Sequence, residues 1–171
     1  MKMEEIIYVV DEKDKFVRKA TRKEVRENAL LHRAARVIII NHENKFLIQK
    51  RPKNKDVNPG LWDMGIAETV RGGDSYESTA MMGLVEELGV IGISNIQMIH
   101  SFLFKIKYFS TNHNILCKVY LLIYNGKINI QTEKIDEAAF ATTDEVKILI
   151  ENEKFSPVGK VVFEKYVETK K

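Results

Sequence analysis

The stretch ETVRGGDSYESTAMMGLVEELG, residues 68–89, is the most informative part of the chain. It predicts an amphipathic helix over Asp74–Leu88, because four apolar residues recur at helical spacing and form one stripe: Met81, Leu84, Val85 and Leu88. Gly89 follows at the position of a C-terminal helix cap. Positions 83 and 87 of such a helix lie one turn apart on one side, with position 86 beside them. The acidic pair Glu86 and Glu87 is therefore expected on one flank of the helix.

Outward from this helix, strands and further helices are expected along the whole chain. The expected strands are Ile6–Val10, a short piece after the turn at Lys13–Lys15, Arg36–Ile40, Phe46–Gln49, Gly60–Ala67, Ile96–Phe109, Ile115–Tyr124 and one near Ile128–Ile130. The other expected helices run from Thr21 to about Leu31, over Thr142–Ile150 and over Val158–Glu168. Residues 52–60 are expected to form a loop. This pattern favours an α+β fold, a mixed sheet packed between helices, in one domain spanning residues 1–171.

Composition is typical of a globular protein, with 44% apolar and 30% charged residues. The longest apolar runs, residues 6–10 and 119–124, are far shorter than the roughly 20 residues that span a bilayer, so no membrane partner is expected. The single cysteine, Cys117, cannot form an internal disulfide, which fits a reducing compartment and a cytoplasmic location.

The net charge of +3 is unevenly distributed: residues 1–60 carry 15 Lys and Arg against 9 Asp and Glu. A basic first half favours an anionic ligand. Nucleic acid is not expected as that ligand, because the basic residues are not interleaved with the aromatic side chains on which bases stack.

Residues 68–90 resemble the Nudix signature: glycine, five residues, glutamate, seven residues, then Arg-Glu-apolar-any-Glu-Glu-any-glycine. Aligned without gaps on Gly89, the chain keeps the end of this pattern in Leu84, Glu86 and Glu87. Four other positions differ, with Glu68 for the first glycine, Asp74 for the first glutamate, Met82 for the arginine and Gly83 for the next glutamate. The chain is identified as a member of the Nudix hydrolase superfamily with a degenerate signature. The resemblance implies a Nudix-type mixed β-sheet sandwiched between helices.

The resemblance also implies a metal-dependent reaction, because hydrolysis of a diphosphate bond uses Mg²⁺ or Mn²⁺ to neutralise phosphate oxygens and activate water. It assigns Glu86 and Glu87 to catalysis and metal binding, with Asp74 as a further metal ligand. The implied activity is hydrolysis of a nucleoside diphosphate linked to another group. Gly83 removes one carboxylate and destabilises the helix by roughly 1 kcal/mol relative to alanine. Met82 removes the arginine that holds the carboxylates in the family.

These departures leave a second interpretation open. The chain could instead be a catalytically inactive Nudix domain that binds a diphosphate compound or a protein partner. The expected partner is a small-molecule diphosphate compound, and a second copy of the chain in a homodimer is an open alternative.

Residues 58–63, Asn-Pro-Gly-Leu-Trp-Asp, resemble the approach to the signature in a subgroup similar to isopentenyl-diphosphate isomerases. The resemblance matches Arg51 and Lys55 to basic residues that contact the substrate diphosphate in that subgroup; an exposed basic loop is the alternative. Isomerase chemistry is not expected, because Ala67, Thr69 and Ile115 stand at the positions of the isomerases' catalytic cysteine, metal-ligand histidine and catalytic glutamate. Of the isomerase metal ligands compared, His32 alone matches. Candidates for a water-activating base in a late loop, each of which also suits a surface position, are Glu133, Asp136 and Glu137.

Overall fold

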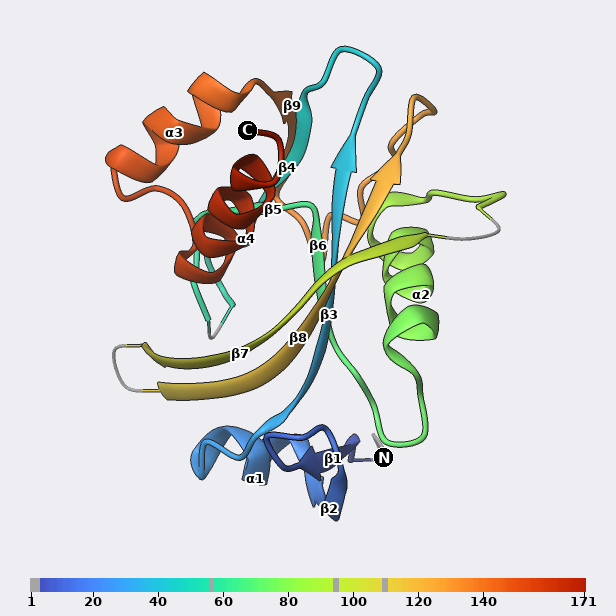
Figure 1. The fold of residues 1–171 in the computed structure, drawn as a ribbon, viewed down its shortest axis with the longest axis vertical. Coiled ribbons are helices and arrows are strands. Elements are labelled where there is room, and N and C mark those ends of the chain that lie inside the picture. The colour runs from blue at the N-terminus through green and yellow to red at the C-terminus, as the bar shows by residue number, and fades with distance from the viewer. Residues whose placement is uncertain (1–3, 56, 94–95, 109–110) are drawn as a thin grey trace.

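The chain folds into a mixed sheet with helices on both sides (Figure 1). The computed structural model describes residues 4–55, 57–93, 96–108 and 111–171, and the side chains outside residues 100–112. The strands are β1 (Ile6–Val10), β2 (Phe16–Thr21), β3 (His32–Ile40), β4 (Phe46–Lys50), β5 (Trp62–Met64), β6 (Ile66–Thr69), β7 (Gln97–Tyr108), β8 (Thr111–Ile123) and β9 (Glu137–Ala141). The helices are α1 (Arg22–Glu27), α2 (Tyr76–Leu88), α3 (Thr143–Glu151) and α4 (Pro157–Glu168). None of the helices in these ranges is long and apolar enough to cross a membrane. The predicted α+β class is confirmed.

Strand β3 lies at the centre of the sheet. It runs parallel to β8, from the pair His32–Ile115 to the pair Ile40–Ile123, and antiparallel to β6. Single antiparallel pairs join β3 to β1 and to β4, and β4 pairs in turn with β5 and β9. Strands β7 and β8 form a long antiparallel ribbon. Since β3 is covered on both faces, its residues 37–40 form an unbroken apolar run.

Two hydrophobic cores lie on the two faces of the sheet. Successive side chains of a strand point to opposite faces, so Ile38 of β3 belongs to a core with Phe163 of α4, whereas Val37 belongs to a core with Leu84 of α2. Figure 1 shows the corresponding layers, with α2 on one side of the sheet and α3 and α4 on the other. A third, smaller core joins β1, β2 and α1 through Ile7 and Val25.

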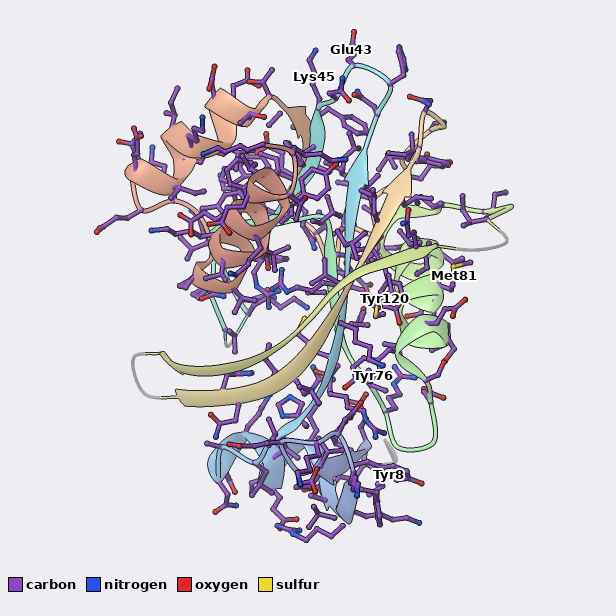
Figure 2. All side chains as sticks on the ribbon, in the orientation of Figure 1. Tyr8, Glu43, Lys45, Tyr76, Met81 and Tyr120 are labelled. Carbon is purple, nitrogen blue, oxygen red and sulfur yellow. The ribbon has the colours of Figure 1, made fainter. Side chains whose placement is uncertain are left out.

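Helix α2 has the predicted ends to within two residues, but a different buried face. Its N-cap is Ser75, in a capping box with Ser78, and its C-cap is Gly89 at a φ of 62°. Of the expected apolar stripe, Val85 is 47% exposed. The buried face is shifted around the helix because β6 packs against it, and it includes Gly83 and Glu87. Figure 2 shows Tyr76, Met81 and Tyr120 around this helix.

One predicted helix is shorter than expected and one predicted strand is divided, and in both cases the backbone conformation gives the reason. Helix α1 ends at Glu27 rather than near Leu31, since Asn28 forms its C-cap and Ala29 has a φ of 49°. The strand expected over Gly60–Ala67 is divided into β5 and β6 at Gly65, which has a φ of 55° and whose added Cβ would collide with the Val37 carbonyl oxygen. The strand expected to end at Phe109 ends at Tyr108 in the structure, and Phe109 lies outside the described residues.

The strand predicted near Ile128–Ile130 is wrong. This segment is a connection that packs its isoleucines against the core beside α2. Its backbone caps the end of α2, because the Asn129 amide donates to the Leu88 carbonyl and the Gln131 amide donates to the Glu87 carbonyl, each at 2.9 Å. The next strand along the chain is β9, which pairs with β4. The capping connection also brings Lys134 to the end of α2.

Candidate functional site

Glu86 and Glu87 lie in the last turn of α2 but in different surroundings. The side chain of Glu86 is 48% exposed, whereas Glu87 is only 8% exposed. The difference follows from the packing of β6 against the helix face that carries Glu87. The two carboxylates therefore do not both point into bulk solvent. Glu87 is directed into the interior between α2 and β6.

Glu68 of β6 faces Glu87 from across this contact. In the antiparallel pairing of β3 and β6, Glu68 lies opposite Ala35, whose side chain belongs to the core on the α2 side of the sheet. Glu68 is therefore on the same face as α2. It reaches the space beside Gly83: a Cβ at position 83 would lie 3.0 Å from Glu68 Cγ and 2.8 Å from Ile66 Cδ1.

The buried Glu87 carboxyl has an unusual electrostatic environment. Its pKa is raised well above the ordinary glutamate value, first by burial and then by hydrogen bonding to Glu68 and by the negative charge of Glu68. Among the described residues, no donor group hydrogen-bonds to Glu87 Oε2, although this atom is buried. Without a cation, one proton shared by the two carboxyl groups would relieve their repulsion. A buried oxygen without a donor is costly, and a water, a proton or a cation would satisfy it.

Lys134 supplies positive charge at the same place. Its Nζ lies 3.0 Å from Glu86 Oε2 and 3.7 Å from Glu68 Oε1. Burial alone would lower the pKa of Lys134, but the hydrogen bond to Glu86 and the charges of Glu68, Glu86 and Glu87 raise it. The ammonium group is therefore charged and lies among three carboxyl groups. A second positive charge, that of Arg71, lies nearby: Arg71 pairs with Glu5 at 2.8 Å, and the charges of Glu86 and Glu68 help to raise its pKa.

A small crevice adjoins these carboxylates, with a volume of about 10 Å³. This carboxylate crevice is lined by Glu68, Thr69, Arg71, Asp74, Thr79, Met82, Gly83 and Glu86. Its volume is about that of one water-sized probe, so it suits a single water or ion. Within the described part of the chain, no three His, Cys, Asp or Glu side chains are already arranged to hold a metal ion. A cation would therefore have to draw the carboxylates together and displace the Lys134 ammonium.

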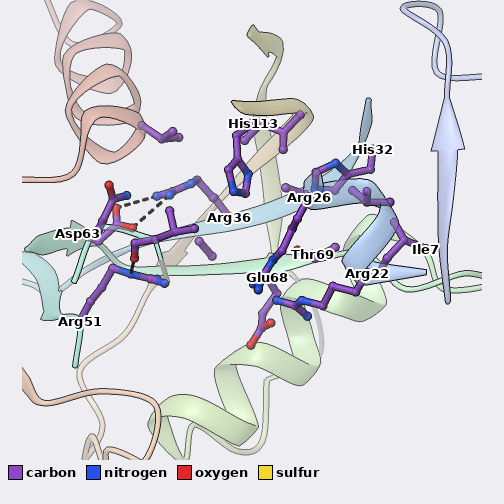
Figure 3. Close-up of a pocket in the computed structure, with 17 residues that line it drawn as sticks. Ile7, Arg22, Arg26, His32, Arg36, Arg51, Asp63, Glu68, Thr69 and His113 are labelled. Atoms are coloured by element: carbon purple, nitrogen blue, oxygen red, sulfur yellow. Dashed lines mark hydrogen bonds and ion pairs between the residues drawn. The ribbon is translucent and has the colours of Figure 1, made fainter. Parts of the chain in front are cut away.

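A larger cavity of about 140 Å³ lies on the other side of Glu68. The ionisable residues that line this arginine cavity are Arg22, Arg26, His32, Arg36, Arg51, Asp63, Glu68 and His113. Figure 3 shows Arg22 and Arg26 reaching toward Glu68 from one side, while Arg51 and the Arg36–Asp63 pair lie at the other end. Glu68 lines both the arginine cavity and the carboxylate crevice. The two spaces thus meet at one side chain.

Arg36 is held in the wall of the arginine cavity by a buried ion pair. Its two terminal nitrogens donate to the two carboxylate oxygens of Asp63, at 2.9 Å and 3.1 Å. Asp63 is 1% exposed and also accepts from the Ser156 hydroxyl at 2.7 Å and from the Met64 amide at 2.8 Å. Burial would raise the pKa of Asp63, but the Arg36 charge and these hydrogen bonds hold it below its ordinary value. Asp63 therefore stays ionised and fixes the position of Arg36.

Two histidines in the arginine cavity are neutral at pH 7. Burial is the main cause that lowers the pKa of His113 to about 4, and the charges of His32, Arg26, Arg22 and Arg51 lower it further. The pKa of His32 is also lowered, first by burial. The ring of His32 is fixed by a 2.9 Å contact between Nδ1 and the Leu30 carbonyl oxygen. The cavity is positive because of its arginines, and this positive charge disfavours a second positive charge on the histidines.

The N-terminal hairpin and α1 form one wall of the arginine cavity. The Thr21 hydroxyl caps α1 by accepting from the Glu24 amide at 3.1 Å, and α1 presents Arg22 from its first turn and Arg26 from its last. The hairpin is attached to the sheet through Asp14, which accepts from Arg33 Nε at 2.6 Å and from the Tyr76 hydroxyl at 3.1 Å. This attachment keeps the arginines of α1 facing the rest of the site.

The residues predicted to bind substrate lie in different places. Arg51 lines the arginine cavity, and its Nε donates to the Val57 carbonyl at 2.8 Å, which orients the guanidinium. Lys55 is half-buried but is not among the residues that line the cavity. Asp74, predicted as a metal ligand, lines the carboxylate crevice. The candidate bases Glu133, Asp136 and Glu137 are exposed.

Sequence reasoning missed Glu68, Lys134, Arg22 and Arg26 as residues of this site. Glu68 carried a signal, since it stands where the signature has a glycine while Gly83 stands where the signature has a glutamate. No sequence feature indicated a role in this site for Lys134 or for the two arginines. They come from segments distant in sequence, and only the fold brings them to the end of α2 and to the cavity.

Comparisons with known proteins agree with this architecture. A model of the NUDIX domain matches residues 30–163, so β1, β2 and α1 lie outside the match. An uncharacterized Nudix hydrolase of Pseudomonas aeruginosa is 29% identical over 136 residues, which cover 80% of this chain and 78% of that protein. The crystal structure of DR0079 from Deinococcus radiodurans aligns with a TM-score of 0.74 at 20% identity, over 92% of this chain and 97% of that one. The NUDIX domain of Shewanella oneidensis NrtR, solved in complex with ADP ribose, aligns with a TM-score of 0.63 at 14% identity, over 81% of this chain and 88% of that one.

Proposed function

Because this chain belongs to the Nudix domain family, we propose that it is a metal-dependent hydrolase of a diphosphate bond in a nucleoside diphosphate linked to another group. One observation carries the proposal: Glu68 lines both the arginine cavity and the carboxylate crevice. A diphosphate at this junction would meet guanidinium groups on one side and a carboxylate-bound cation on the other. This is the charge arrangement that a diphosphate substrate requires.

The side chains at the end of α2 fit Mg²⁺ or Mn²⁺ chemically. Hard divalent cations prefer carboxylate oxygens, and Mg²⁺ keeps several of its own waters. Glu87 presents a buried oxygen that receives no hydrogen bond from the described residues, and the nearby carboxyl groups of Glu68 and Glu86 share one ammonium. We propose that Glu86 and Glu87 hold the metal, with Asp74 at the crevice edge. When bound, the metal neutralises phosphate oxygens and activates water for attack.

The arginines of the cavity would bind and orient the diphosphate. Arg51 is already oriented by its bond to the Val57 carbonyl, so it loses little freedom when its guanidinium meets phosphate oxygens. Arg22 and Arg26 face the same space from α1, which lies outside the part of the chain matched by the family model. We therefore propose that α1 contributes to the choice of substrate.

The substrate is larger than the cavity. Sites for complete small ligands have volumes of about 300–1,000 Å³, whereas the arginine cavity has about 140 Å³. It suits the diphosphate and the group next to it, with the remainder of the substrate outside. The ADP ribose in the NrtR domain is a compound of this class, so it is the first compound to test here.

We also propose that the chain falls within the subgroup similar to isopentenyl-diphosphate isomerases, but without their reaction. Ala67, Thr69 and Ile115, which occupy positions of isomerase catalytic and metal-binding residues, all line the arginine cavity. Isomerisation of an alkene needs an acid and a base on opposite faces of the substrate. Alanine and isoleucine can serve as neither.

A catalytically inactive domain that binds a diphosphate compound is the second candidate. The observation that favours it is the Lys134 ammonium among the carboxylates, since a lysine that stays there would exclude a dication. Phosphate binding by the arginine cavity would persist in such a domain. The two candidates thus differ in metal binding and turnover, whereas both bind the ligand.

Two measurements separate the two candidates. The first is titration of Mg²⁺ and Mn²⁺ by calorimetry. The second is an assay of the phosphate-ester products formed from ADP ribose and other nucleoside diphosphate derivatives. Metal binding and turnover, both abolished by Glu87→Gln, are expected for the hydrolase. Glu77→Gln is the matched control, because Glu77 is an exposed glutamate of the same helix. Ligand binding with neither metal binding nor turnover would overturn the hydrolase and support the binding domain.

A further inference from the structure

We propose that Glu68 supplies the carboxylate that position 83 lacks, so that the divalent-cation site consists of Glu68 from β6 together with Glu86 and Glu87 from α2. The inference rests on the proposed metal-dependent function and deepens it. It means that the site is rebuilt from two elements, where the signature would place its carboxylates on one helix. The change at Gly83 is then an exchange of positions, not the loss of a ligand.

The packing around Gly83 favours the exchange. A Cβ at position 83 would lie 2.8 Å from Ile66 Cδ1 and 3.0 Å from Glu68 Cγ, so a side chain at position 83 would require Ile66 to shift and Glu68 to move by a few tenths of an ångström. Real Cβ atoms essentially never approach other heavy atoms more closely than 3.0 Å. Gly83 therefore makes room for the aliphatic part of Glu68.

The direction of Glu68 is fixed by strand pairing. Glu68 lies opposite Ala35 in the β3–β6 ladder, and Ile66 lies opposite Val37. Ala35, Val37 and Ile66 all belong to the core on the α2 side. Because paired residues of an antiparallel ladder share a face, Glu68 is directed toward α2. A shift of its side chain to the opposite face would require the whole strand to change register.

The charges around Glu68 indicate a cation at this place. Glu87 is buried, its Oε2 receives no hydrogen bond from any described residue, and Glu68 Cγ lies beside position 83, one helical turn before Glu87. Lys134 Nζ already binds Glu68 and Glu86. An ammonium between Glu68 and Glu86 shows that the two carboxylates can share one cation. A dication in the place of the ammonium could also be bound by Glu87 Oε2.

The first test measures Mn²⁺ binding to the full chain by calorimetry and by the decrease of the free Mn²⁺ electron paramagnetic resonance signal. Glu68→Gln keeps the size of the side chain but removes its charge. We expect it to weaken Mn²⁺ binding by at least about tenfold, since loss of even a supporting partner of a metal ligand weakens binding by about 10- to 100-fold. Glu77→Gln should leave Mn²⁺ binding unchanged. Mn²⁺ affinity of Glu68→Gln equal to that of the wild type would overturn the inference.

A thermal-unfolding readout supports the same test independently of metal titration. Without metal, Glu68→Gln ends the repulsion between two neighbouring carboxyl groups but also removes the ion pair with Lys134, so the readout is the Mn²⁺-induced change in melting temperature of each protein. With Mn²⁺ at the same concentration the variant should gain less in melting temperature than the wild type does, because stabilisation by a ligand of the native state grows with the logarithm of its concentration divided by Kd. An equal Mn²⁺-induced gain in the two proteins would contradict a role for Glu68 as a ligand.

The exchange itself is tested by restoring the positions of the signature. Gly83→Glu alone should destabilise the fold, because its side chain crowds Ile66 and Glu68 and adds a third carboxylate beside Glu68 and Glu87, and Glu68→Gly alone should bind Mn²⁺ weakly. The double variant Glu68→Gly with Gly83→Glu should fold better than Gly83→Glu and bind Mn²⁺ more tightly than Glu68→Gly. Additive effects of the two substitutions would overturn the exchange.

The outcomes also separate this inference from the proposed function. If the wild type binds Mn²⁺ and turns over substrate, and the Glu68→Gln variant does both equally well, only the role of Glu68 is refuted. Wild-type protein that neither binds Mn²⁺ nor turns over substrate would refute the metal-dependent function and this inference together.

Discussion

Replacement of Lys134 by glutamine should strengthen metal binding. The Lys134 ammonium lies 3.0 Å from Glu86 Oε2 and 3.7 Å from Glu68 Oε1, so a dication that uses these carboxylates must first break both ion pairs. The three side chains are 26% to 48% exposed, and partly exposed pairs contribute up to about 1 kcal/mol each. Two pairs give about 1–2 kcal/mol, which corresponds to a gain in Mn²⁺ affinity of about 5- to 30-fold.

The same substitution should have the opposite effect on the protein without metal. Loss of both ion pairs leaves three carboxyl groups without their cation, so the free energy of unfolding should fall by about 1–2 kcal/mol. For a chain of this size, that lowers the melting temperature by about 2–8 °C. Lys127→Gln is the matched control, because Lys127 is an exposed lysine of the same connection between β8 and β9. It should change neither quantity.

Calorimetric Mn²⁺ titration and thermal unfolding with and without Mn²⁺ measure the two effects on the same samples. The expected pattern is a crossing, in which Lys134→Gln is less stable than the wild type without metal and gains more from Mn²⁺. Unchanged or weaker Mn²⁺ binding by Lys134→Gln would refute competition between the ammonium and the metal. Lys134 would then be a structural residue or a direct contact of the substrate.

Two further predictions concern the arginine cavity. Asp63→Asn should lower the free energy of unfolding, measured in urea, by about 3–5 kcal/mol, because it leaves the Arg36 charge buried without its partner. The control Glu164→Gln, which removes an exposed ion pair, should lower it by no more than about 0.5 kcal/mol. A loss below about 1 kcal/mol for Asp63→Asn would contradict the reasoning. His113 should titrate at about 4 in nuclear magnetic resonance spectra of the free protein. Since this folded-state pKa lies below the unfolded value of about 6.5, the contribution of His113 to stability is complete above that value and is lost as the pH falls through about 4. Inorganic diphosphate should raise the pKa of His113, and no change on saturation would place the anion elsewhere.

The sequence was sufficient to predict the fold class and most elements because these depend on local patterns. Ser75 and Gly89 bound α2 through capping chemistry that is encoded within a few residues. The same local logic predicted a strand at residues 128–130, where alternating isoleucines follow a turn sequence. That prediction was wrong because the segment caps α2 and packs against its core, a tertiary contact that no local pattern records.

The candidate site was less predictable than the fold. Glu86 and Glu87 could be named from the signature, but their different burial depends on β6, which crosses only one of them. Helical spacing placed Val85 in the apolar stripe, whereas the structure buries Gly83 and Glu87 and leaves Val85 exposed. Glu68 could have been suspected from the paired departures at positions 68 and 83. Lys134 could not, because its distance from α2 along the chain hides their contact.

Competition at the end of α2 decides which of the two proposed functions the chain performs. Free Mg²⁺ must displace the Lys134 ammonium from Glu68 and Glu86 before it can bind these carboxylates. A diphosphate entering through the arginine cavity adds phosphate oxygens that a dication can bind together with Glu68, Glu86 and Glu87. Substrate and metal should therefore bind cooperatively, each tightening the other by the same factor. A compound that reaches the arginines without offering oxygens to the metal would leave Lys134 in place and be bound without hydrolysis.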